Sequence, residues 1–257
     1  MRTFARKLLL PLAIGLSLGA TVQAKEPPHG PMHKMFEELQ LSEQQRQDIR
    51  TLFKQSREDR RVFREDGQIL HEQKQALIEA PSWDEQAALA LLSEAQAERR
   101  TAMWARAQMD QAVWNLLTEE QREVWADMQE ERFDRPDRAP FSGRWLKKLG
   151  LSDEQQATLA ELQAQAKANR EQNHSLMQAF DGQELALIEK ASLTEAAWQS
   201  LYEQYQPQFQ TAALQRLKQR YDFYHLLTAE QQVKLEQFKQ RHKAHKDRSH
   251  PRPHKPD

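Results

Sequence analysis

The sequence repeats itself after 110 residues, and this duplication constrains the fold more than any other feature. Three segments of the first half match segments 110 residues further on: Leu41–Gln45 with Leu151–Gln155, Ala76–Glu79 with Ala186–Glu189, and Leu117–Gln121 with Leu227–Gln231. Matches at three separate places in a single register indicate an internal duplication. We therefore expect two copies of one structural unit, each with the same spacing between its elements.

Most of the repeated segments have the pattern of helix N-termini. In a capping box, a Ser or Thr side chain accepts a hydrogen bond from the backbone N–H three residues later, and Gln or Glu at that position bonds back to the cap. Four such pairs are present: Ser42 and Gln45, Thr118 and Gln121, Ser152 and Gln155, and Thr228 and Gln231. A leucine that can pack as a hydrophobic staple precedes each cap: Leu41, Leu117, Leu151 and Leu227. Ser82 with Glu85 and Ser192 with Glu195 fit the same pattern.

These caps divide each unit into helices. Behind short leading helices at 31–39 and 144–148, they predict helices that begin near residues 42, 82 and 118 in the first unit and near 152, 192 and 228 in the second. Only seven glycines among 257 residues favour a wholly helical chain. The second helix of each unit is expected to be the longest, with Asp66-Gly67 and Asp181-Gly182 as candidate breaks.

The two ends of the chain differ in composition from the repeats. Residues 1–24 combine a basic start, an apolar run and a Val-Gln-Ala end, which is the pattern of a secretory signal peptide. The last residues are rich in His, Lys, Arg and Pro and poor in apolar side chains. We therefore expect five segments: a signal peptide at 1–24, a first helical unit at 25–132, a linker at 133–143, a second helical unit at 144–240, and a disordered, basic, His-rich tail at 241–257.

Composition argues against several classes of function. The chain has no cysteine, which excludes disulfides, thiolate metal sites and thiol catalysis. A net charge of −1 with 29% charged residues argues against a general nucleic-acid-binding protein. The sequence contains no phosphate-binding glycine loop, no HExxH motif and no nucleophile elbow. We expect neither an enzyme nor a protein with a cofactor.

The four Leu-Ser/Thr-x-x-Gln motifs, two in each unit, resemble the LTxxQ signature of the Spy/CpxP family of periplasmic proteins. Met35–Arg50 and Trp114–Gln121 carry the closest likeness, and the resemblance extends over nearly all of residues 31–240. The family implies a subunit of long antiparallel helices, two of which form a cradle-shaped homodimer. Because this chain holds two units, we expect an all-α fold in which one chain acts as a monomeric, cradle-shaped pseudo-dimer.

The resemblance also implies a function and partners. Members of the family chaperone unfolded or misfolded envelope proteins without ATP, and the expected partners are partly folded periplasmic and outer-membrane proteins. Two alternatives within the family are a regulator that docks on the periplasmic domain of an envelope-stress sensor kinase, and a metal-binding or metal-sensing protein. We expect no structural metal site, because the only candidates are four weak ones in the tail: His242, His245, His250 and His254. Neither nucleic acid nor stable membrane insertion is expected.

The helix after the first cap is the expected client-binding surface. Exposed apolar groups bind apolar segments, and long flexible cations attract acidic ones. This helix interleaves basic and apolar side chains, and its expected client-binding residues are Arg46, Arg50, Phe53, Arg57, Arg60, Arg61 and Arg64. In the second unit only Lys167 and Arg170 retain the basic character of this set. We therefore expect the first half of the cradle to be the more basic. The alternative interpretation is a solvated outer face of arginines over an apolar core.

Overall fold

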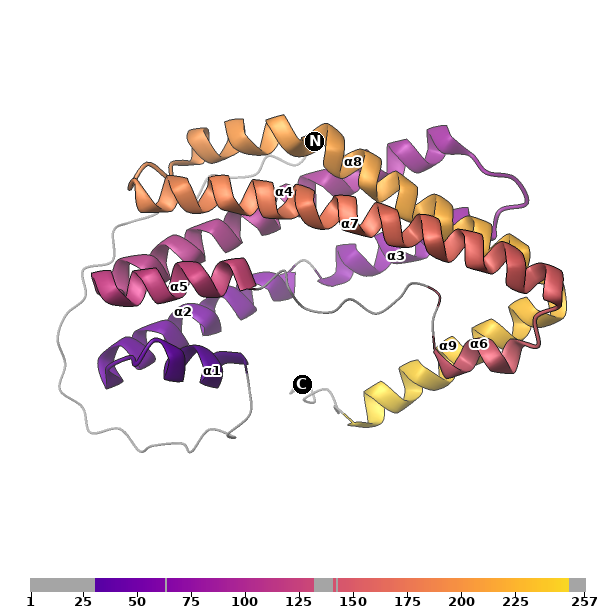
Figure 1. The fold of residues 1–257 in the computed structure, drawn as a ribbon, viewed down its shortest axis with the longest axis horizontal. Helices are drawn as coiled ribbons and strands as arrows, with labels where there is room; N and C mark the ends of the chain where they lie inside the picture. Colours follow the sequence, from indigo (N-terminus) through magenta and orange to yellow (C-terminus); the bar gives the residue numbers. More distant parts are fainter. Residues whose placement is uncertain (1–30, 63, 132–140, 142, 250–257) are drawn as a thin grey trace, which may run out of the picture.

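The computed structural model describes residues 31–62, 64–131, 141 and 143–249, and the regular structure in these ranges is entirely helical (Figure 1). The first unit comprises α1 (Pro31–Glu38), α2 (Glu43–Val62), α3 (Arg64–Glu79), α4 (Glu85–Leu116) and α5 (Glu119–Glu131). The second unit comprises α6 (Arg144–Leu149), α7 (Asp153–Glu189), α8 (Glu195–Leu226) and α9 (Ala229–Ser249). The expected all-α fold of two tandem units is confirmed. The expected signal peptide and nearly all of the expected linker lie outside the described residues.

The two units use the same order of helices. In chain order, α1 corresponds to α6, α2 and α3 together correspond to α7, α4 corresponds to α8, and α5 corresponds to α9. No helix in the described ranges is both long enough and apolar enough to cross a membrane. In Figure 1 the outer end of the first unit, formed by α1, α2 and α5, lies opposite α6 and α9 of the second, and both ends lie on one side of the long α7–α8 pair.

Four of the expected capping boxes are present. The Ser42 Oγ accepts a hydrogen bond from the Gln45 backbone N–H at 3.2 Å, and the Gln45 Oε1 accepts one from the Ser42 N–H at 2.9 Å. The same reciprocal pair of bonds occurs at the other three caps, which begin at Thr118, Ser152 and Thr228. The N-termini of α2, α5, α7 and α9 are therefore set by local sequence.

The caps expected at Ser82 and Ser192 are wrong. The side chain that caps α4 belongs to Asp84, whose Oδ1 accepts from the Ala87 N–H, and the side chain that caps α8 belongs to Thr194. Ser192 instead closes the end of α7, because its hydroxyl donates to the Leu187 carbonyl at 3.2 Å. A Ser near a helix start can satisfy the end of the preceding helix as readily as the start of the next.

The long second helix and the tail also differ from expectation. Gly182 lies inside α7, which continues unbroken from Asp153 to Glu189, and Gly67 lies inside α3. In the first unit α2 ends at Val62 and α3 begins at Arg64, and Phe63 between them lies outside the described residues. At the C-terminus, α9 continues to Ser249, so the first residues of the segment expected to be disordered are helical.

The two units meet where α4 and α8 pack against each other. At this contact, residues that correspond through the 110-residue repeat touch one another. The Gln206 Nε2 donates to the Gln96 Oε1 at 2.9 Å, and the Arg99 guanidinium lies 4.8 Å from the centre of the Phe209 ring. Contacts between corresponding residues mark the position of an approximate two-fold axis. The chain is therefore arranged internally as two related protomers.

Candidate functional site

The two LTxxQ motifs of the first unit bond directly to one another. The Gln45 Nε2 donates to the Gln121 Oε1 at 2.7 Å and to the Leu116 carbonyl at 2.8 Å. In return, the Gln121 Nε2 donates to the Leu39 carbonyl at 3.0 Å and to the Gln45 Oε1 at 3.3 Å. Each glutamine thus closes its own helix cap through its oxygen and joins the other motif through its nitrogen. We call this arrangement the glutamine clamp.

The second unit has the same glutamine clamp. The Gln155 Nε2 donates to the Gln231 Oε1 and to the Leu226 carbonyl, both at 2.8 Å. The Gln231 Nε2 donates to the Gly150 carbonyl at 3.1 Å and to the Gln155 Oε1 at 3.0 Å. These bonds occupy the glutamine amides and hold two helix starts together.

Two of the expected client-binding arginines have local partners near the start of α2. The Arg46 Nε donates to the Leu41 carbonyl at 3.0 Å, and its counterpart Gln156 makes the corresponding bond to the Leu151 carbonyl at 3.0 Å. The Arg50 guanidinium lies 5.4 Å from the centre of the Phe36 ring. Arg46 therefore closes a helix start, a task that a neutral glutamine performs equally well in the other unit.

The remaining expected residues differ in exposure. Phe53 is half-buried and packs on the core cluster around Ile49, whereas Arg57 is exposed. In the second unit Lys167 is exposed, with its Nζ 3.8 Å from Glu171, and Arg170 is half-buried. The side chains of three further expected residues lie outside the part of the chain that the structure describes: Arg60, Arg61 and Arg64.

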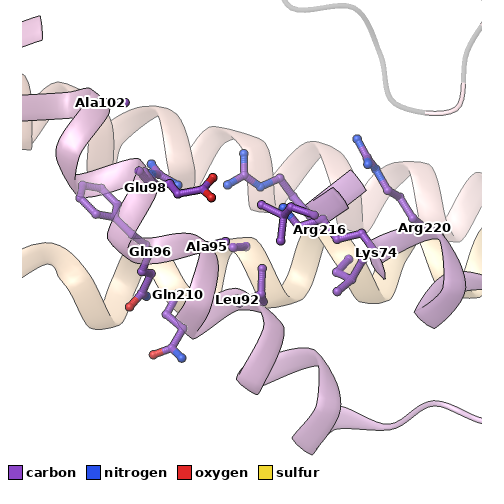
Figure 2. A pocket seen from close by; sticks show the side chains of 14 residues that line it. Lys74, Leu92, Ala95, Gln96, Glu98, Ala102, Gln210, Arg216 and Arg220 are labelled. Carbon is purple, nitrogen blue, oxygen red and sulfur yellow. The ribbon is translucent and has the colours of Figure 1, made fainter. Parts of the chain in front are cut away.

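A groove with a volume of about 480 Å³ lies where α3, α4 and α8 meet. Its apolar lining comes from all three helices and includes Leu70, Leu92, Ala95, Phe209 and Leu217. In Figure 2, Lys74, Arg216 and Arg220 gather at one end of the groove, while Gln96 and Gln210 lie toward the other. The groove therefore combines an apolar wall with a cationic end, and it lies at the junction of the two units.

Basic side chains outnumber acidic ones in the lining of this groove. Four cations line it, namely Lys74, Arg99, Arg216 and Arg220, together with one carboxylate, Glu98. None of the four cations forms an ion pair with a residue that the structure describes. Partial burial lowers the pKa of Lys74, Arg99 and Arg216, and neighbouring guanidinium groups lower it further for Lys74 and Arg216. Cations that repel one another beside an apolar wall favour an anionic occupant.

The sequence-based site did not include this groove. Its cations come from α3, α4 and α8, whereas the expected residues of the first unit lie between 46 and 64. The sequence did contain a signal for the groove. In the 110-residue register, basic Lys74 aligns with acidic Glu184, and basic Arg220 aligns with acidic Asp110. A reversal of charge between the two repeats at these positions could have identified the groove.

The described residues contain no candidate metal site that would support the metal-binding alternative. No group of three or more His, Asp or Glu side chains in the described ranges could hold a metal ion. Of the tail histidines, His242 and His245 lie on α9 with side chains that the structure does not describe, and His250 and His254 lie outside the described residues.

Comparison with known families finds the same duplication. No curated protein and no solved structure gave a match to this chain. The model of the LTXXQ motif family protein matches twice, over residues 28–129 and again over residues 139–239. Each match contains one glutamine clamp, and together the matches cover most of the sequence. The chain belongs to the LTXXQ motif family and carries the family's unit in tandem.

Proposed function

We propose that this protein is an ATP-independent chaperone that holds unfolded or partly folded envelope proteins without catalysing a reaction. Members of the LTXXQ family are typically periplasmic, which supports the periplasm as its location and the envelope stress response as its setting. The observation that carries the proposal is the groove between α3, α4 and α8, with its apolar lining and its four cations without ion-pair partners among the described residues.

Such a surface suits a protein that binds many clients weakly. An unfolded chain exposes apolar side chains, which the apolar lining can remove from water. Acidic groups in the same segment can meet the guanidinium and ammonium groups, whose long side chains adapt to different positions of the partner. A groove of this volume accommodates a few side chains rather than a folded domain, so binding requires an unfolded segment.

The exposed cations of α2 support fast capture by the first unit. Lys54 and Arg57 are exposed on α2, whereas the position that corresponds to Lys54 is an exposed alanine, Ala164. Positive charge on a surface accelerates encounter with acidic partners and does so most strongly at low ionic strength. The two halves of the molecule therefore differ in the charge that an approaching client meets.

Suppression of aggregation is the direct test of this function. A client denatured in urea is diluted into buffer with the protein at about equimolar amount and without nucleotide, and light scattering is followed. We expect the scattering to fall strongly, because capture of apolar segments competes with their self-association. Undiminished scattering at several-fold excess of the protein rejects the proposal. Sedimentation of the protein alone is expected to give a monomer, and a dimer would contradict the single-chain pseudo-dimer.

The asymmetry is tested by capture kinetics. Lys54→Glu with Arg57→Glu is compared with the matched pair Lys167→Glu with Arg170→Glu in the second unit. We expect the first pair to slow association with an acidic unfolded client about threefold more than the second, with a difference that shrinks as salt is added. Equal effects of the two pairs would show that charge on α2 does not guide capture.

A further inference from the structure

The groove has a counterpart on the other side of the approximate two-fold axis, where α4 meets α7. There the Arg106 Nη2 lies 2.6 Å from the Asp181 Oδ1 and 2.9 Å from the Glu184 Oε1, and the Arg106 Nε lies 3.7 Å from the Asp110 Oδ2. The Glu184 side chain is buried, and its Oε2 accepts a hydrogen bond from the Trp198 Nε1 at 2.7 Å. Burial disfavours the charge on Arg106, but the carboxylates outweigh it and raise the pKa of Arg106. This side of the molecule neutralises its own cation.

At the corresponding place in the groove the cation is retained and the acids are lost. The counterpart of Arg106 is Arg216. The three carboxylates have basic counterparts: Lys74 for Glu184, Arg220 for Asp110, and His71 for Asp181. The arginine of this site is therefore paired with carboxylates on one side of the axis and accompanied by further basic residues on the other.

The apolar filling is lost together with the acids. On the α4–α7 side, rings pack into a core cluster that includes Phe180, Trp198, Tyr202 and Tyr205. Residues with smaller side chains occupy the corresponding positions around the groove: Leu70, Ala88, Leu92 and Ala95. The hollow beside Arg106 accordingly has a volume of about 20 Å³, against about 480 Å³ for the groove. The groove is the corresponding site without these four rings and without the three carboxylates that face Arg106.

We infer that the groove is a binding subsite for an unfolded client segment in which an aromatic side chain is flanked by carboxylates. The segment supplies the two components that the chain itself supplies on the α4–α7 side, namely rings, here beside Leu92 and Ala95, and acids, here beside Arg216. This inference rests on the proposed chaperone function, and it specifies the client sequences that the groove selects.

Each part of the segment has an identifiable partner. The ring enters the hollow between Leu92, Ala95 and Phe209, where burial of aromatic area provides most of the affinity. One carboxylate meets Arg216 and Lys74, as Glu184 meets Arg106 on the other side, and a second meets Arg220 at the end of the groove. The charged pairs provide selectivity, because a lysine in place of either acid would face the cluster of cations.

The test measures binding of a short peptide by fluorescence anisotropy, with the full helical body and without any aggregating client. The probe is fluorescein-labelled Ser-Glu-Phe-Asp-Gly-Ser. One analogue carries lysines in place of the acids, and another carries alanine in place of phenylalanine. We expect the probe to bind most tightly, with both analogues weaker by about tenfold, which is the effect of losing one set of desolvated contacts.

Two pairs of substitutions transfer the character of the α4–α7 side to the groove. Lys74→Glu with Arg220→Asp installs the acids, and Leu70→Phe with Ala95→Tyr installs the rings. The first pair is expected to fold, because it recreates beside Arg216 the ion pairs that Arg106 already forms. We expect the first pair to weaken binding of the probe by about tenfold and to make the protein prefer the lysine analogue. The second pair fills the hollow, so it is expected to weaken binding of the probe and of the lysine analogue to the same extent.

The control changes the same charge elsewhere. Lys147→Glu with Lys190→Asp alters two exposed lysines outside the groove and should leave binding of the probe unchanged. Circular dichroism verifies that every variant retains its helices. Equal loss in the control and in Lys74→Glu with Arg220→Asp, or no loss in either, overturns the inference.

Two further probes separate the peptide from other anions. Dodecanoate and inorganic phosphate are each tested as competitors of the labelled peptide. Displacement only at concentrations far above the dissociation constant of the peptide supports a peptide subsite, whereas tight binding of either probe without binding of the peptide overturns it.

If the peptide binds but aggregation is not suppressed, the chaperone function fails and the subsite stands. If aggregation is suppressed equally by the groove variants and the unaltered protein, the subsite fails and the chaperone function stands.

Discussion

At the outer end of each unit two glutamines join two helix starts, and the two units do this with the same atoms. Gln45 and Gln121 in the first unit, like Gln155 and Gln231 in the second, each combine a cap bond, a bond to the other glutamine and a bond to a backbone carbonyl. In the middle of the molecule corresponding residues have different environments. Arg106 is paired with carboxylates, and Arg216 is surrounded by other cations.

This difference shows which positions a fused duplication leaves free to change. A clamp connects elements within one unit, so each copy must keep it for its own helices to pack. A residue at the junction faces the other copy, and in a single chain the two sides of that junction can change separately. A symmetric homodimer has identical side chains on both sides of its axis and cannot place acids on one side alone.

Removing a clamp is expected to have the largest effect on stability. Gln45→Ala with Gln121→Ala removes the return bond of each capping box, the bonds between the glutamines and the donors to two partly buried carbonyls, so we expect a loss of about 4 kcal/mol in the free energy of unfolding of the first unit. Gln155→Ala with Gln231→Ala should cost the second unit a similar amount. Urea unfolding followed by circular dichroism measures both. The control is Gln44→Ala, which removes only an exposed bond to Asp48 and should change little. A large cost in one unit and none in the other would break the equivalence of the clamps.

Substitutions on the α4–α7 side of the junction should reduce the stability of the protein more than the corresponding substitutions in the groove. Glu184→Ala leaves the Trp198 N–H without an acceptor and removes one of the carboxylates that neutralise Arg106, so we expect a loss of about 3 kcal/mol. Its counterpart, Lys74→Ala, removes a cation from a repulsive group and should cost much less. The midpoints of urea unfolding compare the two variants directly. Equal losses of stability in the two variants would mean that the two sides of the junction do not differ in their contribution to folding.

Exchanging the residues that follow the leading helices of the two units is expected to have a smaller effect on stability. Gln40 has a φ of 47° and its counterpart Gly150 has a φ of 68°, a left-handed conformation that glycine adopts without strain. We expect Gln40→Gly to raise the free energy of unfolding by about 1 kcal/mol and Gly150→Gln to lower it by a similar amount. Thermal unfolding measures both. A destabilised Gln40→Gly variant would indicate that the glutamine side chain matters more than its backbone.

The smallest expected effect is a dependence of stability on alkaline pH. Partial burial and the charges of Arg220 and Arg216 lower the pKa of Lys74 in the folded protein below 10.5. Between that lowered pKa and 10.5 the unfolded chain binds more protons at Lys74, so its contribution to the free energy of unfolding rises with pH in this window. The difference in stability between the unaltered protein and Lys74→Gln should move in favour of the unaltered protein as the pH rises. A difference that stays constant across the window contradicts this assignment.

The helical frame could be predicted from sequence because its signals are local. Ser42 and Gln45 are three residues apart, and the bonds between them form whenever the helix forms. Where two local signals competed, prediction failed: Ser82 and Asp84 both fit a cap, and only the packed turn assigned the cap to Asp84. Gly182 was a candidate break that α7 tolerates, because packing of that helix outweighs the modest cost of one glycine.

The candidate site could be predicted only in part, because its residues meet through tertiary structure. The basic character of α2 can be predicted from the sequence, and the exposure of Arg57 agrees with this prediction. Half-buried Phe53 shows that one residue of the expected surface packs on the core. Lys74 and Arg216 are far apart in the chain, and no pattern along either helix shows that they line one groove.

The sequence by itself determined that the protein is helical, that it contains one unit twice, and that four capped motifs define the unit, since each of these follows from residues within a few positions of one another or from a constant offset. Tertiary structure alone decided that the glutamines of paired motifs bond to each other, and that one side of the junction is filled, with its arginine paired to carboxylates, while the other is hollow and cationic. The physical reason is that charge and volume at a junction depend on which side chains face one another, and the packing of α4 and α8 sets those neighbours across the 110 residues that separate Gln96 from Gln206.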